Sequence, residues 1–475
     1  KIEFDLIETT VKDEVKKLED EISHITSNPM LKGLGIPKEI ADKIIKISSK
    51  QTQILETFNE IKKSNVKPFF LFQLHFSDVF EKKGGFDVVI ANPPYVSFGL
   101  RGVGKTNNGW VDSLRRIYPN SAEYKLSLYA IFIDRGLQLL GDDGVLTYVT
   151  PDSFLLGRYF SKLRRFILDG CRIIEILMFE KDFWESGVVG RPVITLLERN
   201  LDSNVRKNNI PTYKLYHSLD AFNRNIVNAF SYPQNYFDNT SFNRFRLFFE
   251  SSQKSIADKL QIGSRPLSDF MNFASGLIGK KGKEQIISKE NKGSNWHPGL
   301  LSGGEIERYA IHYENNYILF DTKVLKSGFK EAKYFEPKIL LRQTGDSLIA
   351  AYDDKKLLCL NNLHVGNLKN KKWDIKYILA LLNSKLLNYY YHLISLETGR
   401  TMAQIDIETL EELPIKESSD HIVASILNLV EKIIITNKER STTNVNEYEN
   451  QIDQLVYKLY GLTLEEIKIV EGSND

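Results

Sequence analysis

The sequence predicts an α/β domain with a parallel or mixed sheet, preceded by a helical segment and followed by an α+β domain with C-terminal helices. Short, continuous apolar runs, typical of strands buried on both faces, alternate with helix-period stretches between residues 66 and 205. Residues 201–350 instead combine short strand-like pieces with many turns. The 475 residues leave room for about two to four domains.

The helical segment covers residues 1–65. Apolar residues recur there at spacings of three and four and make one stripe: Val11, Val15, Leu18, Ile22 and Ile25. A second amphipathic run extends from Ile40 to Ile61. The two runs predict a helical hairpin whose role is structural and not catalytic.

The α/β domain covers residues 66–205, and its elements follow in order. The predicted strands are Phe86–Ala91, Val145–Val149, Ile173–Met178 and Pro192–Leu197. The predicted helices are Leu126–Leu140 and Phe154–Ile167, and residues 141–144 read as a turn. This alternation favours a sheet that is covered by helices on both faces.

Residues 206–420 form the predicted α+β domain, and residues 421–475 form the C-terminal helices. Ile375–Tyr391 is apolar nearly all round, which predicts one buried helix near the end of the α+β domain. Helical periods return at Ile422–Ile435 and Tyr448–Leu459.

Composition limits the classes of function. Lys plus Arg number 63 and Asp plus Glu 61, so a uniformly basic coat for nucleic acid is excluded. Residues 201–350 carry a net charge of about +6, which suits a polyanion partner or a plain solvated surface equally well. Two cysteines are too few for a disulfide framework or a Cys-rich zinc module, and the histidines lack metal-ligand spacing, so no metal site is predicted. No apolar run approaches the roughly 20 residues of a membrane span.

The residues Asn92-Pro93-Pro94-Tyr95 directly follow the first predicted strand, where ligands of α/β sheets usually bind. Two prolines leave no N–H group, so the outward-facing polar groups are acceptors: the Asn92 side-chain oxygen and the Pro93 carbonyl. Together with the Tyr95 ring, they suit an aromatic amine that donates both hydrogens while its ring stacks. The bland alternative is a proline-rich turn that ends a strand.

This motif, after Phe86–Ala91, resembles motif IV of gamma-class DNA adenine-N6 methyltransferases. The resemblance implies a Rossmann-like methyltransferase sheet in which Asn92, Pro93, Pro94 and Tyr95 hold a flipped-out adenine. It implies that Asp78 contacts S-adenosylmethionine, where the alternative is a helix or turn cap. It also places Phe183 as a second stacking ring, although the adjacent Trp184 or a plain core role is nearly as good.

Later segments, among them Leu301–Tyr309, Phe335–Arg342 and Leu413–Ile415, resemble the TaqI-type specificity domain of type IIG restriction–modification proteins. The resemblance implies a DNA target-recognition domain, double-stranded DNA as partner, and a cytoplasmic protein, which we expect to be a monomer without a membrane contact. Six basic residues of this region are candidates for phosphate contacts, with ordinary surface charge as the alternative for each. They are Lys280, Lys281, Lys283, Arg308, Lys338 and Arg342.

One departure from the family is large. Its glycine-containing cofactor loop belongs before Asp78, but residues 1–77 contain no such turn after a strand. We therefore expect a methyltransferase sheet that is incomplete at its N-terminus, a fragment that binds S-adenosylmethionine poorly, and no methylation by this chain alone. Mg²⁺ is expected only if a nuclease lies upstream, since Pro151-Asp152 has no suitably placed nuclease partner here.

Two other functions stay open at this point. The first is a DNA-binding specificity module without catalysis. The second is a P-loop NTPase, because residues 99–106 match the G-x-x-x-x-G-K-[ST] pattern. A phosphate loop needs a strand directly before it and a helix at its Lys-Thr, and neither is expected here. A Gly-rich loop over the adenine pocket is the better interpretation.

Overall fold

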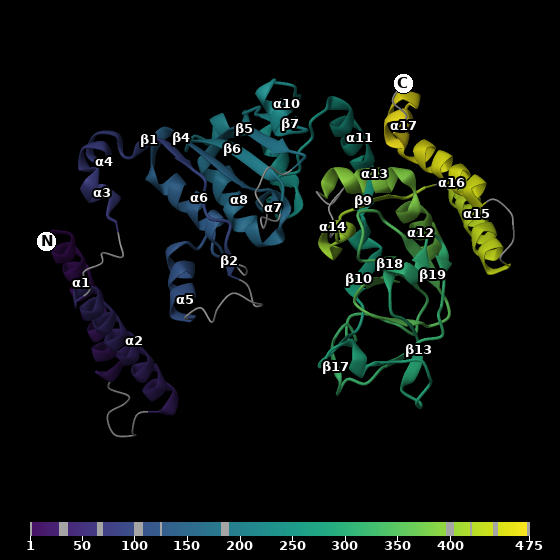
Figure 1. Cartoon of the computed structure of the whole chain (residues 1–475), viewed down its shortest axis with the longest axis horizontal. Helices are drawn as coiled ribbons and strands as arrows, with labels where there is room; N and C mark the ends of the chain where they lie inside the picture. Colours follow the sequence, from purple (N-terminus) through teal and green to yellow (C-terminus); the bar gives the residue numbers. More distant parts are fainter. Residues whose placement is uncertain are drawn as a thin grey trace. The chain divides into compact units, whose positions relative to one another are not determined.

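The computed structural model describes residues 2–27, 37–63, 70–98, 108–123, 126–181, 190–395, 403–418, 420–439 and 445–472. The chain divides into two compact units (Figure 1). One unit comprises Lys1–Asp87 with Leu139–Gly144, and the other Val88–Gln138 with Val145–Asp475. The domain boundaries predicted near residues 65, 205 and 420 remain predictions.

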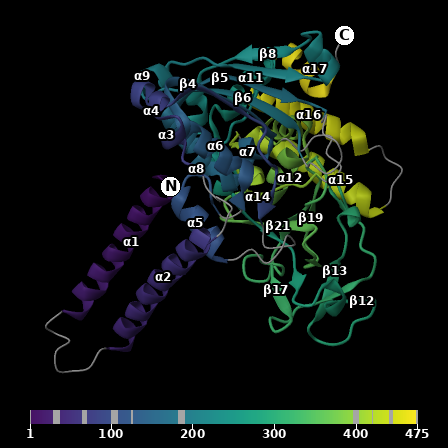
Figure 2. The same ribbon diagram turned by 60° about the vertical axis from the view of Figure 1, so that its left-hand side comes forward.

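The first unit begins with a helical hairpin, as predicted. α1 (Ile2–Thr26) and α2 (Lys38–Lys63) lie side by side (Figures 1 and 2). Lys62, at the end of α2, pairs with Glu8, near the start of α1, at 3.1 Å, so the helices run antiparallel. Among the described side chains of α1 and α2, the buried apolar ones are Leu18, Ile47 and Phe58.

An aromatic cluster surrounds two short helices of this unit. α3 (Phe72–His75) and α4 (Ser77–Lys83) are short, and the phenylalanines around them contact one another ring to ring. These are Phe70, Phe72, Phe76, Phe80 and Phe86. Gly84 ends α4 with a φ of 74°, the left-handed conformation that glycine adopts at helix ends, and the first strand follows two residues later.

Within the described residues, six strands form the central sheet. In spatial order they are β1 (Phe86–Ala91), β4 (Leu140–Pro151), β6 (Pro192–Arg199), β5 (Cys171–Phe179), β7 (Thr212–Tyr216) and β8 (Asn228–Ser231). β6 runs antiparallel to both β4 and β5, whereas β5 and β7 are parallel, so the sheet is mixed. Its middle is fully buried, because Leu146, Ile173, Ile176 and Val193 have no exposed surface. The predicted α/β fold with a mixed sheet is confirmed.

The helices of this region depart from the prediction at one place. They are α5 (Asn108–Ile117), α6 (Leu128–Leu139), α7 (Ser153–Leu156), η2 (Arg158–Phe160), α8 (Ser161–Gly170), α9 (Ser203–Lys207) and α10 (Leu219–Asn223). The single helix predicted over Phe154–Ile167 is wrong, because Gly157 takes an extended ψ of 129° and separates α7 from η2 and α8. The predicted turn at residues 141–144 is instead part of β4, in which Asp143 has a φ of 60°.

β1 is not buried on both faces, contrary to the prediction. It lies at the end of the described sheet, with β4 as its neighbour. The side chains of Val88 and Ile90 are 60% and 76% exposed. β1 is therefore an apolar strand with exposed side chains, which is unusual because continuous apolar strands are normally buried on both faces.

The C-terminal domain contains two further sheets of four strands each among the described residues. The first pairs β10 (Met271–Ser275), β21 (Leu363–Leu368), β18 (Lys338–Arg342) and β19 (Ala350–Asp353), all antiparallel. The second orders β12 (Ile287–Ser288), β16 (Tyr317–Leu319), β13 (Trp296–Leu300) and β20 (Leu358–Cys359). One apolar cluster, including Leu277, Leu300, Ile318, Leu340 and Val365, joins them.

Smaller elements occur along the whole described chain. The short strands are β2 (Ser97–Phe98), β3 (Leu126–Ser127), β9 (Ser264–Pro266), β11 (Ile278–Gly279), β14 (Ile306–Glu307), β15 (Ala310–Ile311), β17 (Leu325–Ser327) and β22 (Pro414–Lys416). The 3₁₀ turns are η3 (Gln234–Asn239), η4 (Ser241–Asn243), η5 (Leu267–Asp269), η6 (Lys283–Gln285) and η7 (Gly303–Glu305).

Helices complete the C-terminal part. They are α11 (Ser251–Gln261), α12 (Ile375–Asn383), α13 (Lys385–Ile394), α14 (Ile407–Glu411), α15 (Asp420–Glu439), α16 (Val445–Tyr460) and α17 (Leu464–Glu471). The predicted single helix Ile375–Tyr391 is two helices, because Ser384 has a ψ of 149° and caps α13 through its side chain. The predicted C-terminal helices are confirmed. Over the described part of the chain, no helix is both long enough and apolar enough to cross a membrane.

Candidate functional site

The turn Asn92–Tyr95 leaves the sheet directly after β1. Asn92 and Pro94 are exposed, Pro93 is buried and Tyr95 is half-buried. The buried proline holds the backbone against the sheet, while the asparagine side chain remains open to a ligand.

The Tyr95 hydroxyl is the centre of this turn. It donates a hydrogen bond to Asn92 Oδ1, and it lies 3.1 Å from the carbonyl oxygen of Val149 on β4. Burial raises the pKa of Tyr95 to about 12, so the phenol keeps its proton at neutral pH and remains a donor. Tyr95 therefore orients the Asn92 amide, whose oxygen keeps a second lone pair for a ligand.

The other predicted cofactor-binding and stacking residues are Asp78, Phe183 and Trp184. Asp78 lies in the first turn of α4, in the first unit, and its side chain is 89% exposed with Lys82 3.8 Å away. Phe183 and Trp184 lie outside the described residues, as do residues 99–106 with the P-loop pattern.

The residues that follow β4 were not predicted as site residues. The sequence suggested Pro151-Asp152 only as part of a nuclease motif. The Ser153 and Tyr129 hydroxyls lie 2.7 Å apart, and Asp152 is fully buried. These residues begin three positions after Val149, whose carbonyl faces Tyr95. A signal was available, because polar residues at the end of a buried strand often line a ligand site.

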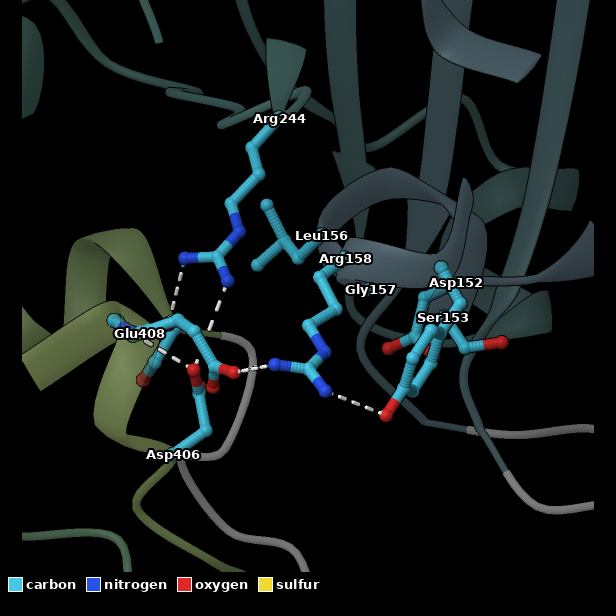
Figure 3. A pocket seen from close by; sticks show the side chains of 11 residues that line it. Asp152, Ser153, Leu156, Gly157, Arg158, Arg244, Asp406 and Glu408 are labelled. Carbon is cyan, nitrogen blue, oxygen red and sulfur yellow. Dashed lines mark hydrogen bonds and ion pairs between the residues drawn. The ribbon is translucent and has the colours of Figure 1, made fainter. Parts of the chain in front are cut away.

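A cavity of about 420 Å³ opens beside these residues (Figure 3). One wall comes from the end of β4, α7 and η2, and the other from the segment leading into α14 and from Arg244. The lining residues are Asp152, Ser153, Leu156, Gly157, Arg158, Tyr159, Arg244, Ser395, Asp406, Glu408 and Thr409.

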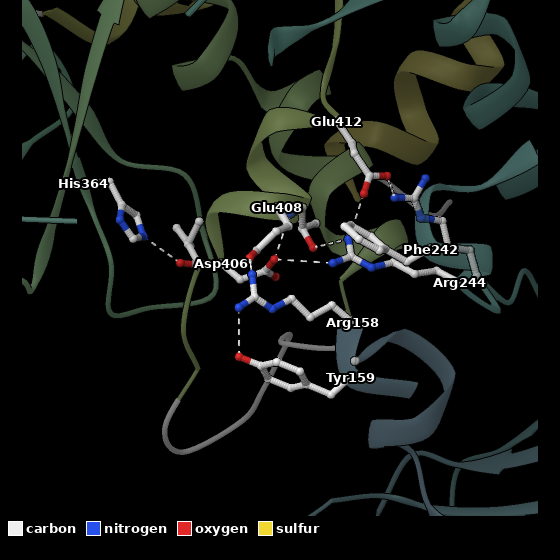
Figure 4. A network of polar contacts seen from close by, with 12 residues as sticks. Arg158, Tyr159, Phe242, Arg244, His364, Asp406, Glu408 and Glu412 are labelled. Carbon is white, nitrogen blue, oxygen red and sulfur yellow. Dashed lines mark hydrogen bonds and ion pairs between the residues drawn. The ribbon is translucent and has the colours of Figure 1, made fainter. Parts of the chain in front are cut away.

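A buried polar network, here called the joint network, shares two residues with the cavity lining and consists of Arg244, Arg246, Thr409 and Glu412. Figure 4 shows Arg244 and Glu412 in it. Arg244 Nη1 donates to Thr409 Oγ1 and to Glu412 Oε1, each at 2.9 Å, and Arg246 pairs with the other oxygen of Glu412. The side chains of Arg244 and Glu412 are 4% and 14% exposed. The network connects the segment that follows η4 to α14.

A third buried arginine fixes the cavity wall itself. Arg164 on α8 donates to four backbone carbonyls, those of Phe154, Gly157, Phe242 and Asn243, at 2.6 to 3.0 Å. Burial, and next the charge of Arg244, lower the pKa of Arg164 to about 9, so it stays protonated at neutral pH. The broken helix around Gly157 is therefore held in place by an arginine.

The predicted DNA-contact residues have different surroundings. Lys280, Lys281 and Lys283 are exposed around β11 and η6, although Lys280 also donates to the Lys323 carbonyl at 2.7 Å. Arg308 lies 3.9 Å from Glu449 on α16. The half-buried Arg342 donates to the Ile306 carbonyl at 2.7 Å.

Lys338 requires a correction. Its side chain and that of Asp353 are both 0% exposed, and they form an ion pair inside the domain, where Lys338 also donates to the Tyr334 carbonyl at 2.6 Å. A lysine in these surroundings cannot reach a DNA phosphate. It belongs to the interior of the C-terminal domain.

His364 has a core role. It is buried on β21, and its Nε2 lies 2.7 Å from the Ile405 carbonyl oxygen. Within the described ranges, no group of three or more His, Cys, Asp or Glu side chains is placed to hold a metal ion.

Comparison with protein families gives two matches. Residues 10–184 match the Eco57I restriction-modification methylase family, and residues 299–415 match the TaqI-like C-terminal specificity domain. The first match includes the Asn92–Tyr95 turn, and the second includes Glu408 and Glu412.

Curated relatives agree with these matches. RM.MjaORFECS2P of Methanocaldococcus jannaschii, which carries the name of a type II restriction enzyme and methyltransferase, is 24% identical over 410 residues. That alignment covers 80% of this chain and 31% of the relative, so the chain spans about a third of its length. The type II methyltransferase M.BstVI of Geobacillus stearothermophilus is 32% identical over 122 residues, covering 25% of this chain and 21% of that protein.

A solved structure shares the fold. The type IIL restriction-modification enzyme MmeI, solved in complex with DNA, is 12% identical and has a TM-score of 0.53, covering 86% of this chain and 59% of that chain. The chain thus combines an Eco57I-type restriction–modification methylase region with a TaqI-like C-terminal specificity domain.

Proposed function

We propose that this chain carries the catalytic turn and the DNA-recognition part of a DNA adenine-N6 methyltransferase of a restriction–modification system. The observation that carries the proposal is the Asn92–Tyr95 turn, in which an exposed asparagine is oriented by a protonated tyrosine at the end of β1. The match to a methylase family over residues 10–184 and the match to a specificity domain over residues 299–415 support DNA methylation.

In this proposal the target adenine leaves the duplex and its amino group enters the turn. The free lone pair of Asn92 Oδ1 and the Pro93 carbonyl accept the two amine hydrogens. The nitrogen lone pair, otherwise delocalised into the ring, then becomes localised for attack. Tyr95 offers its ring to the base and keeps Asn92 in place. Phe183 remains a proposed second stacking residue.

S-adenosylmethionine would supply the methyl group. Among the described residues, Asp78 fits one part of the cofactor, because its exposed carboxylate is open to accept hydrogen bonds. We propose that further residues outside this chain complete the cofactor site against β1. The exposed Val88 and Ile90 on the end strand support this, since apolar side chains of such a strand are normally covered.

Double-stranded DNA is the proposed partner of the C-terminal domain. Lys280, Lys281, Lys283, Arg308 and Arg342 are the proposed phosphate contacts, of which the three lysines near η6 are exposed, and the buried Lys338 is removed from the predicted set. Such contacts would position the domain on the duplex without specifying its sequence.

The test is methylation by the full-length gene product that contains this chain, with labelled S-adenosylmethionine and plasmid DNA. We expect label on adenine N6 for the unchanged protein and a loss of about a hundredfold or more for Asn92→Ala, because one positioning acceptor is removed. Asn235→Ala, an exposed asparagine elsewhere, is the matched control and should retain activity.

Two outcomes would contradict the proposal. Equal labelling by Asn92→Ala would remove the turn from the reaction. Salt-sensitive DNA binding without any methylation would leave a specificity module that lacks catalysis.

A further inference from the structure

The two arginines of the 420 Å³ cavity have opposite surroundings. Arg244 is 4% exposed and is held by Thr409 and Glu412. Arg158, on η2, is 45% exposed, and its guanidinium contacts Glu408 and the Tyr159 hydroxyl (Figures 3 and 4). Arg244 is a structural residue of the joint network, whereas Arg158 is placed to meet a ligand.

Arg158 has unused binding capacity. A guanidinium carries five N–H donors, and its contacts among the described residues use two of them. Its carboxylate partner there, Glu408, is itself 29% exposed. Partly exposed ion pairs contribute little to stability, so a stronger anion can replace Glu408 at little cost. A phosphate, which an arginine can bind through two parallel hydrogen bonds, is such an anion.

A second donor of the cavity has no partner among the described residues. The Ser395 side chain is 4% exposed, and its Oγ has no hydrogen bond among the described residues. Buried hydroxyls normally have a partner, because an unpaired one costs free energy. A phosphate oxygen that enters the cavity would provide the missing acceptor for Ser395 as well as a ligand for Arg158.

The cavity lies close to the catalytic turn. Val149 on β4 faces the Tyr95 hydroxyl at 3.1 Å, and the cavity lining starts at Asp152. Three residues of extended chain span about 10 Å. A nucleotide that is held by Asn92 and Tyr95 therefore brings the neighbouring phosphates of its strand to the cavity.

We propose that Arg158 is a positioning residue that leaves Glu408 and binds a phosphate of the DNA strand beside the flipped nucleotide. This inference rests on the proposed function. Glu408 lies on α14, next to the joint network. The exchange therefore also changes a contact of the C-terminal domain when the target strand is bound.

The test measures DNA binding by this chain with a short fluorescent duplex of mixed sequence, over a series of KCl concentrations. Each phosphate contact contributes about 0.9 to the slope of log affinity against log salt. We expect Arg158→Ala to lower that slope by about one and Arg158→Lys to restore it. Glu408→Gln should tighten binding without lowering the slope, because it frees Arg158 from its competitor.

Arg165→Ala is the matched control. Arg165 on α8 is 41% exposed and pairs with Asp169 and Asp238 outside this cavity, so its removal changes the net charge equally. We expect it to keep the wild-type slope. Melting temperatures of all variants would show that each one folds.

The outcomes separate the two proposals. A wild-type slope for Arg158→Ala, or an equal decrease for Arg165→Ala, would overturn the role of Arg158 while DNA methylation that depends on Asn92 still stood. No binding of duplex by the unchanged chain would refute the proposed function, and this inference with it.

Discussion

The joint network and the Asn92–Tyr95 turn treat polar side chains in opposite ways. In the network, two buried arginines share one carboxylate, and the Nε of each has no hydrogen bond among the described residues. In the turn, the asparagine is exposed and has one internal partner. Buried polar groups here hold elements together, whereas exposed ones remain available for chemistry.

The largest expected effect comes from breaking the joint network. Glu412→Ala leaves Arg244 and Arg246 buried without their shared carboxylate, and removing one partner of a buried pair costs about 3–5 kcal/mol of the free energy of unfolding. Urea denaturation measures it. The control is Asp169→Ala, which breaks the exposed pair with Arg165 and should cost under about 1 kcal/mol. Equal losses for the two variants would erase the contrast between buried and exposed pairs.

A smaller loss of stability is expected from Gly157→Ala, in the wall of the cavity. A Cβ there would lie 2.7 Å from the Ser153 carbonyl oxygen, which Arg164 prevents from moving freely by holding the neighbouring carbonyls. Overpacking of this kind costs about 1–3 kcal/mol. Gly170→Ala, with open space around its Cβ, is the control. An unchanged thermal midpoint for Gly157→Ala would show that this wall can yield.

His364 tests a buried polar group that stands outside the network. Burial lowers the pKa of His364 from the usual 6.5, because the charged imidazolium loses its contact with water in this position. The unfolded chain therefore binds more protons just below pH 6.5. Stability is full above that pH and falls as the pH drops from 6.5 toward the lowered pKa, by up to about 1.4 kcal/mol per pH unit.

Urea denaturation between about pH 5 and 7.5 measures this slope. His364→Gln should keep the contact with the Ile405 carbonyl and flatten the pH dependence. If both proteins lose stability in parallel, His364 is not the group that titrates.

The smallest effect is expected at the turn itself. Tyr95→Phe removes the hydroxyl that bonds Asn92 and should cost about 0.5–1.5 kcal/mol, the usual net value of one hydrogen bond. Methylation should fall by more than this loss of stability explains, since Asn92 is no longer oriented. If Tyr95→Phe has normal kcat and KM, the Tyr95 hydroxyl is not needed to orient Asn92.

Much of the fold could be predicted from the sequence. Four of the six described strands of the central sheet and the N-terminal hairpin follow from periodicity, because each of these elements shows a clear apolar run or stripe, whereas β7 and β8 were not predicted. The failures occurred where one residue changes the backbone within a uniform pattern. Ser384 breaks a segment that is apolar all round, and Gly157 divides another without interrupting its period.

The site was predicted less completely. Asn92–Tyr95 stands out because the four residues are adjacent, and the comparisons place it in a methylase region. Arg158, Arg244 and Glu412 lie up to 254 positions apart, from Arg158 to Glu412, and no local pattern marks their meeting. Lys338 shows the reverse error, because a lysine in a basic segment gives no sign that Asp353 will bury it.

The joint network has a consequence for exchanging recognition modules between related proteins. Arg244 and Arg246 precede the region 299–415 that matches the specificity domain, whereas Glu412 lies inside it. A chimera cut at residue 299 would combine two arginines from one parent with the Glu412 carboxylate of another. A chimera cut before Arg244 takes both arginines and Glu412 from the same parent. We expect it to be soluble, whereas the chimera cut at residue 299 should aggregate.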